Sequence, residues 1–295
     1  MRHFQVNVRK TPTEYGFMPT MQLYLVDGGS KKRPIVLIAP GGGYTTLCTD
    51  SDGDRVAMQY NAAGFHAAVL GYSVQPHHFP EPQQDMLLAI RILRENAEEW
   101  RIREDAIAIC GFSAGGHLCA SVSTLWQRMG KDGILDCKTE TTAVQNATTK
   151  DCSGNVEAAQ KQTMPDSPYR PNAAILCYAI LTTRLGHCKD FLAGHVGGDE
   201  EKLHLAAPDR QVGEQTPPTF LYGTFEDKLT NVENILYYSE QLSKYNVSFE
   251  SHIFPKGNHG APWCDDTIWA KPARGRDYNY IRLSVEWMRE LFGLL

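Results

Sequence analysis

At residues 110–118 the chain reads Cys-Gly-Phe-Ser-Ala-Gly-Gly-His-Leu. The apolar run 106–110 is typical of a buried strand, and the small residues that follow it can begin a helix. A serine therefore lies at a strand-to-helix turn, with one glycine two residues before it and another two residues after it. Strand, serine and helix approach so closely at such a turn that a side chain at position 111 or 115 would collide with its neighbours, so glycine is favoured at both.

The Gly-x-Ser-x-Gly pattern between a strand and a helix is typical of the nucleophile elbow of α/β hydrolases, in which a sharp turn lifts a serine hydroxyl clear of the sheet. The alternative is an ordinary glycine-rich turn in which Ser113 only caps the helix. The strand-turn-helix context favours the catalytic interpretation. The partners that a serine nucleophile needs decide between the two.

Composition excludes several classes of partner. The chain of 295 residues carries a formal net charge of −5 and has no Lys/Arg-rich run, so we expect neither nucleic acid nor an anionic membrane surface as a partner. The N-terminus lacks the apolar core of a signal peptide, and no stretch approaches the roughly eighteen apolar residues that span a bilayer. We therefore expect a cytoplasmic protein that acts on small molecules or neutral polymers, with homo-oligomerisation left open.

Neither the cysteines nor the paired histidines form a metal-binding pattern. The eight cysteines include no Cys-x-x-Cys pair, and Cys110 and Cys177 lie inside apolar, strand-like runs, which is typical of small core residues in a reducing compartment. His77 and His78 are adjacent, so they face apart, and no carboxylate lies at ligand spacing. We interpret both histidines as exposed loop residues and expect no metal or other cofactor.

Apolar patterns predict the architecture. Alternating or unbroken apolar runs predict strands near 4–8, 21–25, 35–39, 67–70, 106–110, 173–179, 218–223 and 247–253. Helical spacing predicts helices at about 54–63, 86–97, 232–245 and 280–291. Strands that alternate with helices predict an α/β fold, a mostly parallel eight-stranded sheet with helices on both faces. No linker and no repeat is found, so we expect one domain over residues 1–295.

Two stretches lack this periodicity. Residues 127–170 are polar and too long for an ordinary connection. We expect a surface insertion there, which either covers part of the active site or has no role. Residues 182–216 form a second stretch that we expect to be irregular.

A glycine-rich loop follows the strand predicted at 35–39, in the segment Pro-Gly-Gly-Gly-Tyr at 40–44. Three successive glycines leave backbone N–H groups free to point into a cleft, as stabilisation of an oxyanion requires. The alternatives are a flexible turn or a phosphate loop, but no Gly-Lys-Ser/Thr follows, and the dinucleotide fingerprint has a different spacing. The loop is therefore interpreted as part of an oxyanion hole, with proline where an HGGG-type motif has histidine.

A serine nucleophile needs a base and a carboxylate that orients it, and in hydrolases of this fold they follow in the order Ser, Asp or Glu, His. Asp227 lies directly after a late strand; Glu226 is its rival, and a helix-capping or solvated acid is the alternative for either. Of the ten histidines, His259 lies on a loop after the last strand. His252 lies within that strand and His117 on the helix after the serine, so both are expected to pack.

Four segments carry a resemblance to a known family. They read Pro-Gly-Gly-Gly-Tyr at 40–44, Gly-Phe-Ser-Ala-Gly-Gly-His-Leu at 111–118, Pro-Pro-Thr-Phe-Leu-Tyr at 217–222 and His-Ile-Phe-Pro-Lys-Gly-Asn-His-Gly at 252–260. Together they are similar to the α/β-hydrolase esterases that are grouped with acetylxylan esterases and hormone-sensitive-lipase-like carboxylesterases. The similarity runs from about Arg33 to the C-terminus and weakens over 127–170.

The resemblance implies an α/β-hydrolase fold, with Ser113 as the nucleophile, Asp227 as the acid and His259 as the base. It also implies that the backbone N–H groups of the oxyanion hole belong to the three small residues Ala114, Gly42 and Gly43. One departure stands out. Residues 228–232, Lys-Leu-Thr-Asn-Val, replace the more apolar turn that commonly follows the acid in this family.

Aromatic residues guide the substrate expectation. Trp126, Trp263 and Trp269 lie near the elbow or after the histidine loop, and flat aromatic faces suit sugar rings, with core or lid packing as the alternative. We take Tyr44 and Trp263 as candidate substrate-binding residues. No long amphipathic lid indicates insoluble lipids.

We therefore expect a serine esterase that removes short acyl groups, above all acetyl, from sugars or oligosaccharides. Its partner would be a small-molecule ester or an acylated oligosaccharide. Three alternatives remain open: a general short-chain carboxylesterase, a peptidase or amidase of the same fold, and a hydrolase-fold binding protein without catalysis.

Overall fold

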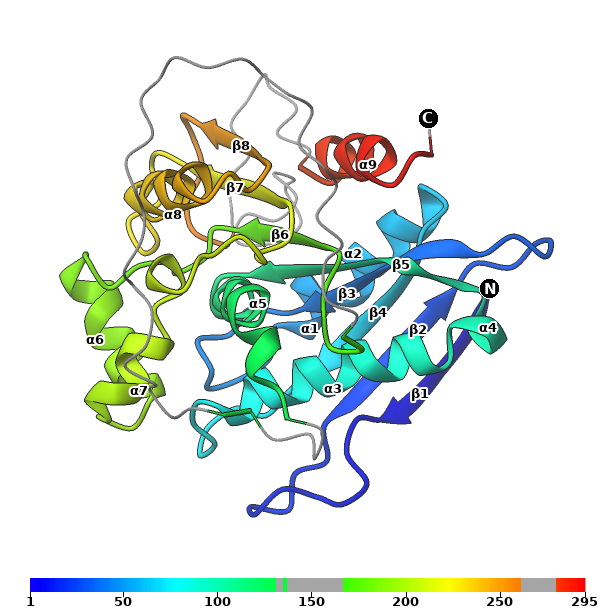
Figure 1. The fold of residues 1–295 in the computed structure, drawn as a ribbon, viewed down its shortest axis with the longest axis horizontal. Helices are drawn as coiled ribbons and strands as arrows, with labels where there is room; N and C mark the ends of the chain where they lie inside the picture. The colour runs from blue at the N-terminus through cyan, green and yellow to red at the C-terminus, as the bar shows by residue number, and fades with distance from the viewer. Residues whose placement is uncertain (131–134, 137–166, 261–279, 295) are drawn as a thin grey trace.

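The computed structural model describes residues 1–130, 135–136, 167–260 and 280–294. Their core is an eight-stranded sheet in the order β1-β2-β4-β3-β5-β6-β7-β8 (Figure 1). The strands are β1 Arg2–Asn7, β2 Thr20–Leu25, β3 Arg33–Ala39, β4 His66–Gly71, β5 Ile102–Phe112, β6 Ala173–Cys177, β7 Thr219–Thr224 and β8 Phe249–Phe254. Strand β2 pairs antiparallel with β1 and β4, and the other pairs are parallel. The predicted mostly parallel sheet is confirmed.

Helices cover both faces of the sheet. One face packs against α3 Glu81–Glu95, α5 Ala114–Leu125 and α8 Glu233–Lys244, and the other against α2 Asp54–Ala62 and α9 Tyr280–Leu291 (Figure 1). Strand β3 shows why its sequence is an unbroken apolar run. Ile35 and Leu37 enter the core on one face and Val36 and Ile38 the core on the other, and all four are fully buried.

The stretch 182–216 was expected to be irregular, and this prediction is wrong. It contains α6 Gly186–His195 and α7 Glu200–Leu205. Helix α7 begins with a side-chain cap, because Asp199 Oδ1 accepts the N–H groups of Glu201 and Lys202, both at 3.1 Å. Helix α6 buries only three residues and includes two glycines, so its apolar spacing is too weak to be read from the sequence. The remaining short elements are α1 Thr49–Asp52, α4 Ala97–Trp100 and 3-10 turns at Trp126–Arg128 and Pro208–Arg210.

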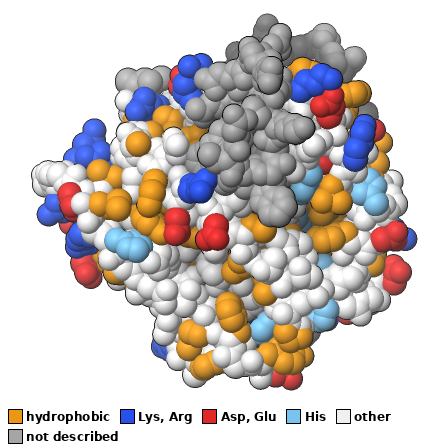
Figure 2. All heavy atoms as spheres, turned by 180° about the vertical axis from the view of Figure 1, so that it is seen from behind, with side chains coloured by type: hydrophobic (Ala, Val, Ile, Leu, Met, Phe, Trp, Pro, Cys, Tyr) orange, Lys and Arg blue, Asp and Glu red, His pale blue; other side chains and the backbone are white. Residues whose placement is uncertain are grey.

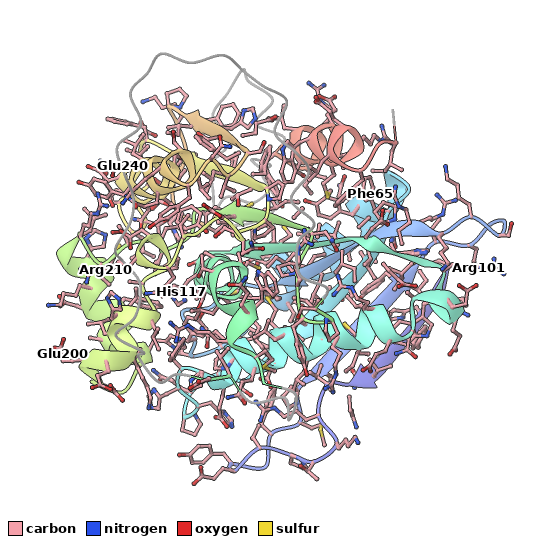
Figure 3. All side chains as sticks on the ribbon, viewed as in Figure 1. Phe65, Arg101, His117, Glu200, Arg210 and Glu240 are labelled. Carbon is pink, nitrogen blue, oxygen red and sulfur yellow. The ribbon has the colours of Figure 1, made fainter. Side chains whose placement is uncertain are left out.

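Two histidine predictions have different outcomes. His117 packs as expected: its Nε2 contacts the Ala206 oxygen at 2.7 Å, on the side of α5 that is turned toward α7 (Figure 3). His77 was expected to be exposed like His78, but it is 3% exposed. Its Nε2 lies 2.7 Å from Thr13 Oγ1, because the loop between β1 and β2 folds over it. A contact between residues so far apart in sequence leaves no local pattern.

The predicted insertion at 127–170 falls mostly outside the described residues.

On the face shown in Figure 2, acidic and basic side chains lie interspersed over the described surface. Among the helices of the described segments, none combines the length and the apolar character needed to cross a membrane.

Candidate active site

Ser113 occupies the turn between β5 and α5 with a φ of 52°, a left-handed conformation that is unusual for a residue with a side chain. Its N–H donates to the Cys177 oxygen at 3.0 Å, which ties the turn to the end of β6. A Cβ at Gly111 would lie 2.1 Å from the Gly115 oxygen, and a Cβ at Gly115 would lie 2.1 Å from the Ala39 oxygen. The steric reason for the two glycines is therefore confirmed.

Three side chains from the loops after β5, β7 and β8 meet at the carboxyl edge of the parallel strands. His259 Nε2 lies 2.8 Å from Ser113 Oγ, and His259 Nδ1 lies 2.9 Å from Asp227 Oδ2. Asp227 is 1% exposed. Its rival Glu226 instead forms an ion pair with Lys256 at the surface. The structure thus brings together the three residues that the sequence singled out, and it places Asp227 rather than Glu226 against the imidazole.

Asp227 is held as a carboxylate by several donors. Its Oδ1 accepts the N–H groups of Leu229 at 2.8 Å and Thr230 at 3.0 Å, and its Oδ2 contacts the Thr230 hydroxyl at 2.8 Å. Burial by itself would raise the pKa of Asp227, but the His259 imidazole and the Thr230 donors outweigh burial and hold this pKa below its ordinary value. The carboxylate is therefore charged where it faces His259 Nδ1.

The glycine loop lies beside Ser113. Gly42 and Gly43 have φ values of 130° and 65°, and a Cβ at Gly42 would lie 2.1 Å from the Thr46 oxygen. Gly41 donates its N–H to Asp52 Oδ2 at 2.9 Å, so this group is already engaged. The N–H of Ala114 is the first of α5 and has no intrahelical acceptor. The assignment of Ala114, Gly42 and Gly43 as oxyanion donors stays a prediction.

A cavity of about 480 Å³ opens onto Ser113 and His259. One part of its wall is polar and belongs to the glycine loop and α1, with Ser51 and Asp52. Another part is mainly apolar and comes from the segment after β6, from α6 and from the turn after Asp227. The residues of this second part are Tyr178, Ile180, His187, Cys188, Phe191 and Leu229.

The candidate substrate-binding residue Tyr44 does not line this cavity. It is 2% exposed, its hydroxyl lies 2.7 Å from His117 Nδ1, and its ring stacks on that of His195 with centroids 3.7 Å apart. Tyr44 is therefore a core residue beneath the loop, and the expectation that it contacts substrate is corrected. The positive φ of Tyr44, 58°, turns its side chain in a direction that the sequence does not reveal. Trp263 lies outside the described residues.

Sequence reasoning missed several residues at this site. Asp52, Thr230 and the apolar wall of the cavity carry no motif, because they reach the site through loops and short helices rather than through a fixed spacing from Ser113. The sequence marks Thr230 only through the segment 228–232, which is more polar than the turn that commonly follows the acid in the resembling family.

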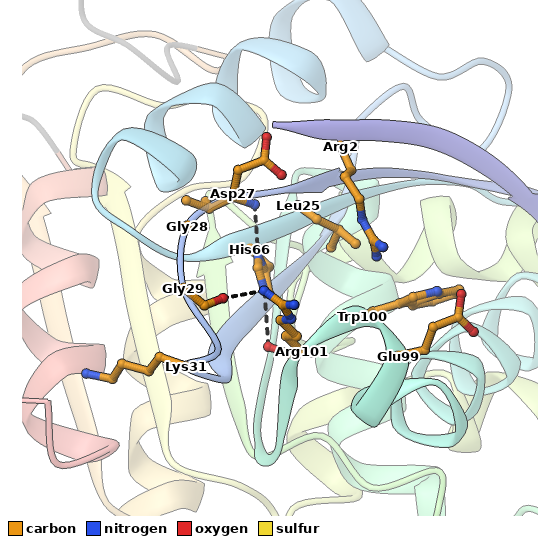
Figure 4. A pocket seen from close by; sticks show the side chains of 11 residues that line it. Arg2, Leu25, Asp27, Gly28, Gly29, Lys31, His66, Glu99, Trp100 and Arg101 are labelled. Carbon is orange, nitrogen blue, oxygen red and sulfur yellow. Dashed lines mark hydrogen bonds between the residues drawn. The ribbon is translucent and has the colours of Figure 1, made fainter.

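A second hollow, of about 270 Å³, lies at the amino ends of β3, β4 and β5 (Figure 4). His66 there uses both ring nitrogens: Nδ1 accepts the Val26 N–H at 3.0 Å, and Nε2 lies 3.1 Å from the Arg101 oxygen. Burial lowers the pKa of His66 to about 4, so the ring is neutral near pH 7. This histidine links two loops, which is a structural role at the edge of the sheet opposite Ser113.

Comparison with known proteins places this geometry in context. The BD-FAE family model matches residues 21–242, a range that includes Ser113 and Asp227. Endo-1,4-beta-xylanase B of Butyrivibrio fibrisolvens is 30% identical over 275 residues, which cover 90% of this chain and 38% of the relative. Acetylxylan esterase of Xylanibacter ruminicola is 28% identical over 232 residues, which cover 75% of this chain and 39% of the relative. The chain thus spans about two fifths of the length of these curated relatives.

Among solved structures, an acetyl ester-xyloside bifunctional hydrolase from Caldicellulosiruptor lactoaceticus superposes with a TM-score of 0.75 at 27% identity, covering 100% of this chain and 98% of that one. The α/β-hydrolase fold and the resemblance to acetylxylan esterases are therefore confirmed.

Proposed function

Because the chain belongs to the BD-FAE family, we propose that it is a serine esterase that removes short acyl groups, above all acetyl, from sugars or oligosaccharides. The observation that carries the proposal is the continuous line of contacts from Ser113 Oγ through the His259 ring to Asp227 Oδ2, at 2.8 and 2.9 Å. In acyl transfer through a serine, an adjacent base activates the nucleophile, and in the Ser-His-Asp arrangement a carboxylate orients that base.

In the first half of the reaction, Ser113 Oγ attacks the ester carbonyl carbon while His259 Nε2 takes the hydroxyl proton. Asp227 keeps the proton of the imidazole on Nδ1, so that Nε2 is free to act as the base, and its charge stabilises the imidazolium that forms. The imidazolium then protonates the leaving alcohol oxygen, and an acyl-serine ester remains.

The carbonyl oxygen becomes an oxyanion during this attack. Backbone N–H groups of Ala114, Gly42 and Gly43 are the proposed donors. Ala114 directly follows Ser113, Gly42 and Gly43 line the same cavity as Ser113, and the Gly41 N–H is already bound to Asp52. In the second half, water loses a proton to His259 and attacks the acyl carbon. The oxyanion collapses, Ser113 Oγ leaves with the proton from His259, and the acid is released.

The substrate class is supported from two sides. The names of the matched relatives, an acetylxylan esterase and an acetyl ester-xyloside hydrolase, refer to acetyl esters and xylosides. In this chain, Ser51 and Asp52 offer polar atoms on one side of the cavity that could contact sugar hydroxyls, and Ile180 and Phe191 lie among apolar residues on another. A carbohydrate ester has both kinds of surface.

The test is hydrolysis of a p-nitrophenyl ester series from acetate to octanoate, beside acetylated xylo-oligosaccharides, with Ser113→Ala as the control. Release of acetate from both substrates by the parent protein, lowered about a thousandfold or more in the variant, supports the proposal. Activity confined to acyl chains of eight or more carbons contradicts it.

A general short-chain carboxylesterase is the second candidate, and the apolar part of the cavity wall favours it. It predicts serine-dependent turnover of the synthetic esters without release of acetate from the oligosaccharides. Absence of turnover on all esters would direct attention to amide substrates. Absence of labelling of Ser113 by a fluorophosphonate probe would indicate a binding protein.

A further inference from the structure

Thr230 lies in the segment 228–232, the departure from the apolar turn of the resembling family. The residue is 5% exposed. Its hydroxyl oxygen lies 2.8 Å from Asp227 Oδ2, 3.1 Å from His259 Nδ1 and 2.9 Å from the backbone oxygen of Tyr178. A polar side chain thus lies beside the direct contact of the Asp227 carboxylate with the His259 imidazole, where an apolar residue could make none of these hydrogen bonds.

A threonine hydroxyl has one hydrogen, so it donates to one acceptor at a time. The Asp227 carboxylate is charged and slightly closer than the Tyr178 carbonyl, and hydrogen bonds to charged acceptors are the stronger ones. The hydroxyl of Thr230 therefore donates to Asp227 Oδ2. The same oxygen accepts the N–H of His259, at 2.9 Å, so two donors share it.

The position of Thr230 is fixed from two directions. Its N–H donates to Asp227 Oδ1 at 3.0 Å, within the turn that follows β7. On the other side lies Tyr178, whose N–H donates to the Tyr222 oxygen at 2.7 Å and whose ring meets the His259 ring edge-on with centroids 5.1 Å apart. The segments that follow β6 and β7 thus hold the hydroxyl beside the contact of Asp227 with His259.

We propose that Thr230 is a positioning residue for the reaction proposed above. Its hydroxyl donates a hydrogen bond to the same Asp227 oxygen that faces His259. This hydrogen bond draws on the negative charge of that oxygen and so limits how strongly the carboxylate stabilises the protonated imidazole. Without this hydroxyl, more of the carboxylate charge is directed at His259, and the base keeps its proton to a higher pH. The inference rests on the proposed esterase function.

Other titratable groups face the same pair and stay in place when Thr230 is changed. They are the buried Asp52 of α1, the Tyr178 phenol after β6, His187 and Cys188 of α6, Cys48 directly before α1 and the Ser113 hydroxyl. The exposed pair of Glu226 and Lys256 lies beside the loops that carry Asp227 and His259. A difference in pH dependence between the parent and a Thr230 variant therefore reports on the hydroxyl.

Two variants separate the hydroxyl from the shape of the side chain. Thr230→Val keeps the branched shape and removes the hydroxyl, whereas Thr230→Ser keeps the hydroxyl and removes a methyl group. The measurement is kcat/KM for p-nitrophenyl acetate as a function of pH, whose acidic limb reports protonation of the base in the free enzyme. We expect Thr230→Val to move this limb to higher pH by roughly 0.5 unit or more, and Thr230→Ser to keep the limb of the parent.

If Thr230 only fills space, the outcome is different. Thr230→Val then has the same acidic limb as the parent protein, and Thr230→Ser, which lacks a methyl group, is the less stable of the two variants in thermal unfolding. That result overturns the inference while serine-dependent turnover by the parent is retained. Failure of the proposed function is distinct, because then the parent and Ser113→Ala have the same low rate and no limb is measured. A downward shift of the limb in Thr230→Val also contradicts the inference.

Discussion

Asp52 Oδ2 accepts the backbone N–H of Gly41 at 2.9 Å, which ties a buried carboxyl group on α1 to the glycine loop beside Ser113. Asp52 Oδ1 accepts the Ser51 hydroxyl at 2.8 Å. Burial raises the pKa of Asp52, although these donors and the nearby His259 oppose the rise. Both carboxyl oxygens of Asp52 are thus engaged as acceptors, one by the Gly41 N–H and one by the Ser51 hydroxyl.

This relationship predicts different effects for two substitutions. Asp52→Asn keeps an oxygen for the Gly41 N–H, so we expect kcat to stay within a few-fold of the parent. Asp52→Ala leaves a buried N–H without its acceptor, at a cost of about 1–3 kcal/mol, and we expect kcat to fall about tenfold or more. Steady-state kinetics on p-nitrophenyl acetate measures both. Equal losses in the two variants would show that the charge matters instead.

Asp227→Asn should lower kcat by about 10⁴-fold, because an amide can neither hold His259 in the required tautomer nor stabilise the imidazolium. The matched control is Glu226→Gln, one residue earlier, where the carboxylate pairs with Lys256 on the surface. We expect this control to retain the activity of the parent. A large loss in Glu226→Gln together with a small loss in Asp227→Asn would reverse the assignment of the acid.

Gly115→Ala should destabilise the protein by about 3 kcal/mol or more, because the new Cβ would lie 2.1 Å from the Ala39 oxygen and 2.5 Å from the Pro40 oxygen, both of them backbone atoms. Gly194→Ala is the control, since nothing lies within 4 Å of its Cβ position on α6. There alanine should be neutral or stabilise by up to about 1 kcal/mol. Urea unfolding followed by circular dichroism compares the two, and equal stabilities would contradict the packing of the turn.

Stability should fall as the pH drops from about 6.5 toward 4, in part because of His117. Burial lowers the pKa of His117 from its ordinary 6.5 to about 4. Between pH 6.5 and pH 4 the unfolded chain binds a proton at this histidine and the folded chain does not. The contribution of the neutral histidine to the free energy of unfolding, up to about 3 kcal/mol, is therefore complete above pH 6.5 and is lost as the pH falls. His117→Gln should flatten this decline. Urea unfolding at pH 7 and pH 5 tests it, and an equal decline in parent and variant would refute it.

Much of the fold could be predicted because its signals are local. The run at 35–39 is apolar on every residue since β3 is buried on both faces, and the glycines around Ser113 are dictated by contacts under 3 Å. The candidate triad could also be predicted from the sequence, because parallel strands end at one edge of the sheet and their following loops meet there. Asp227 and His259 therefore reach Ser113, although the serine and the histidine are 146 residues apart.

The residues around the triad were decided by the tertiary structure alone. Tyr44 lies next to the glycines in sequence, yet a left-handed backbone turns its ring onto His195, far along the chain. Thr230 and Asp52 acquire their roles from neighbours on other loops, and helix α6 provides part of the cavity wall although its apolar spacing is weak. Periodicity and spacing encode which face of an element is buried, whereas the partners of a polar atom depend on how separate loops meet.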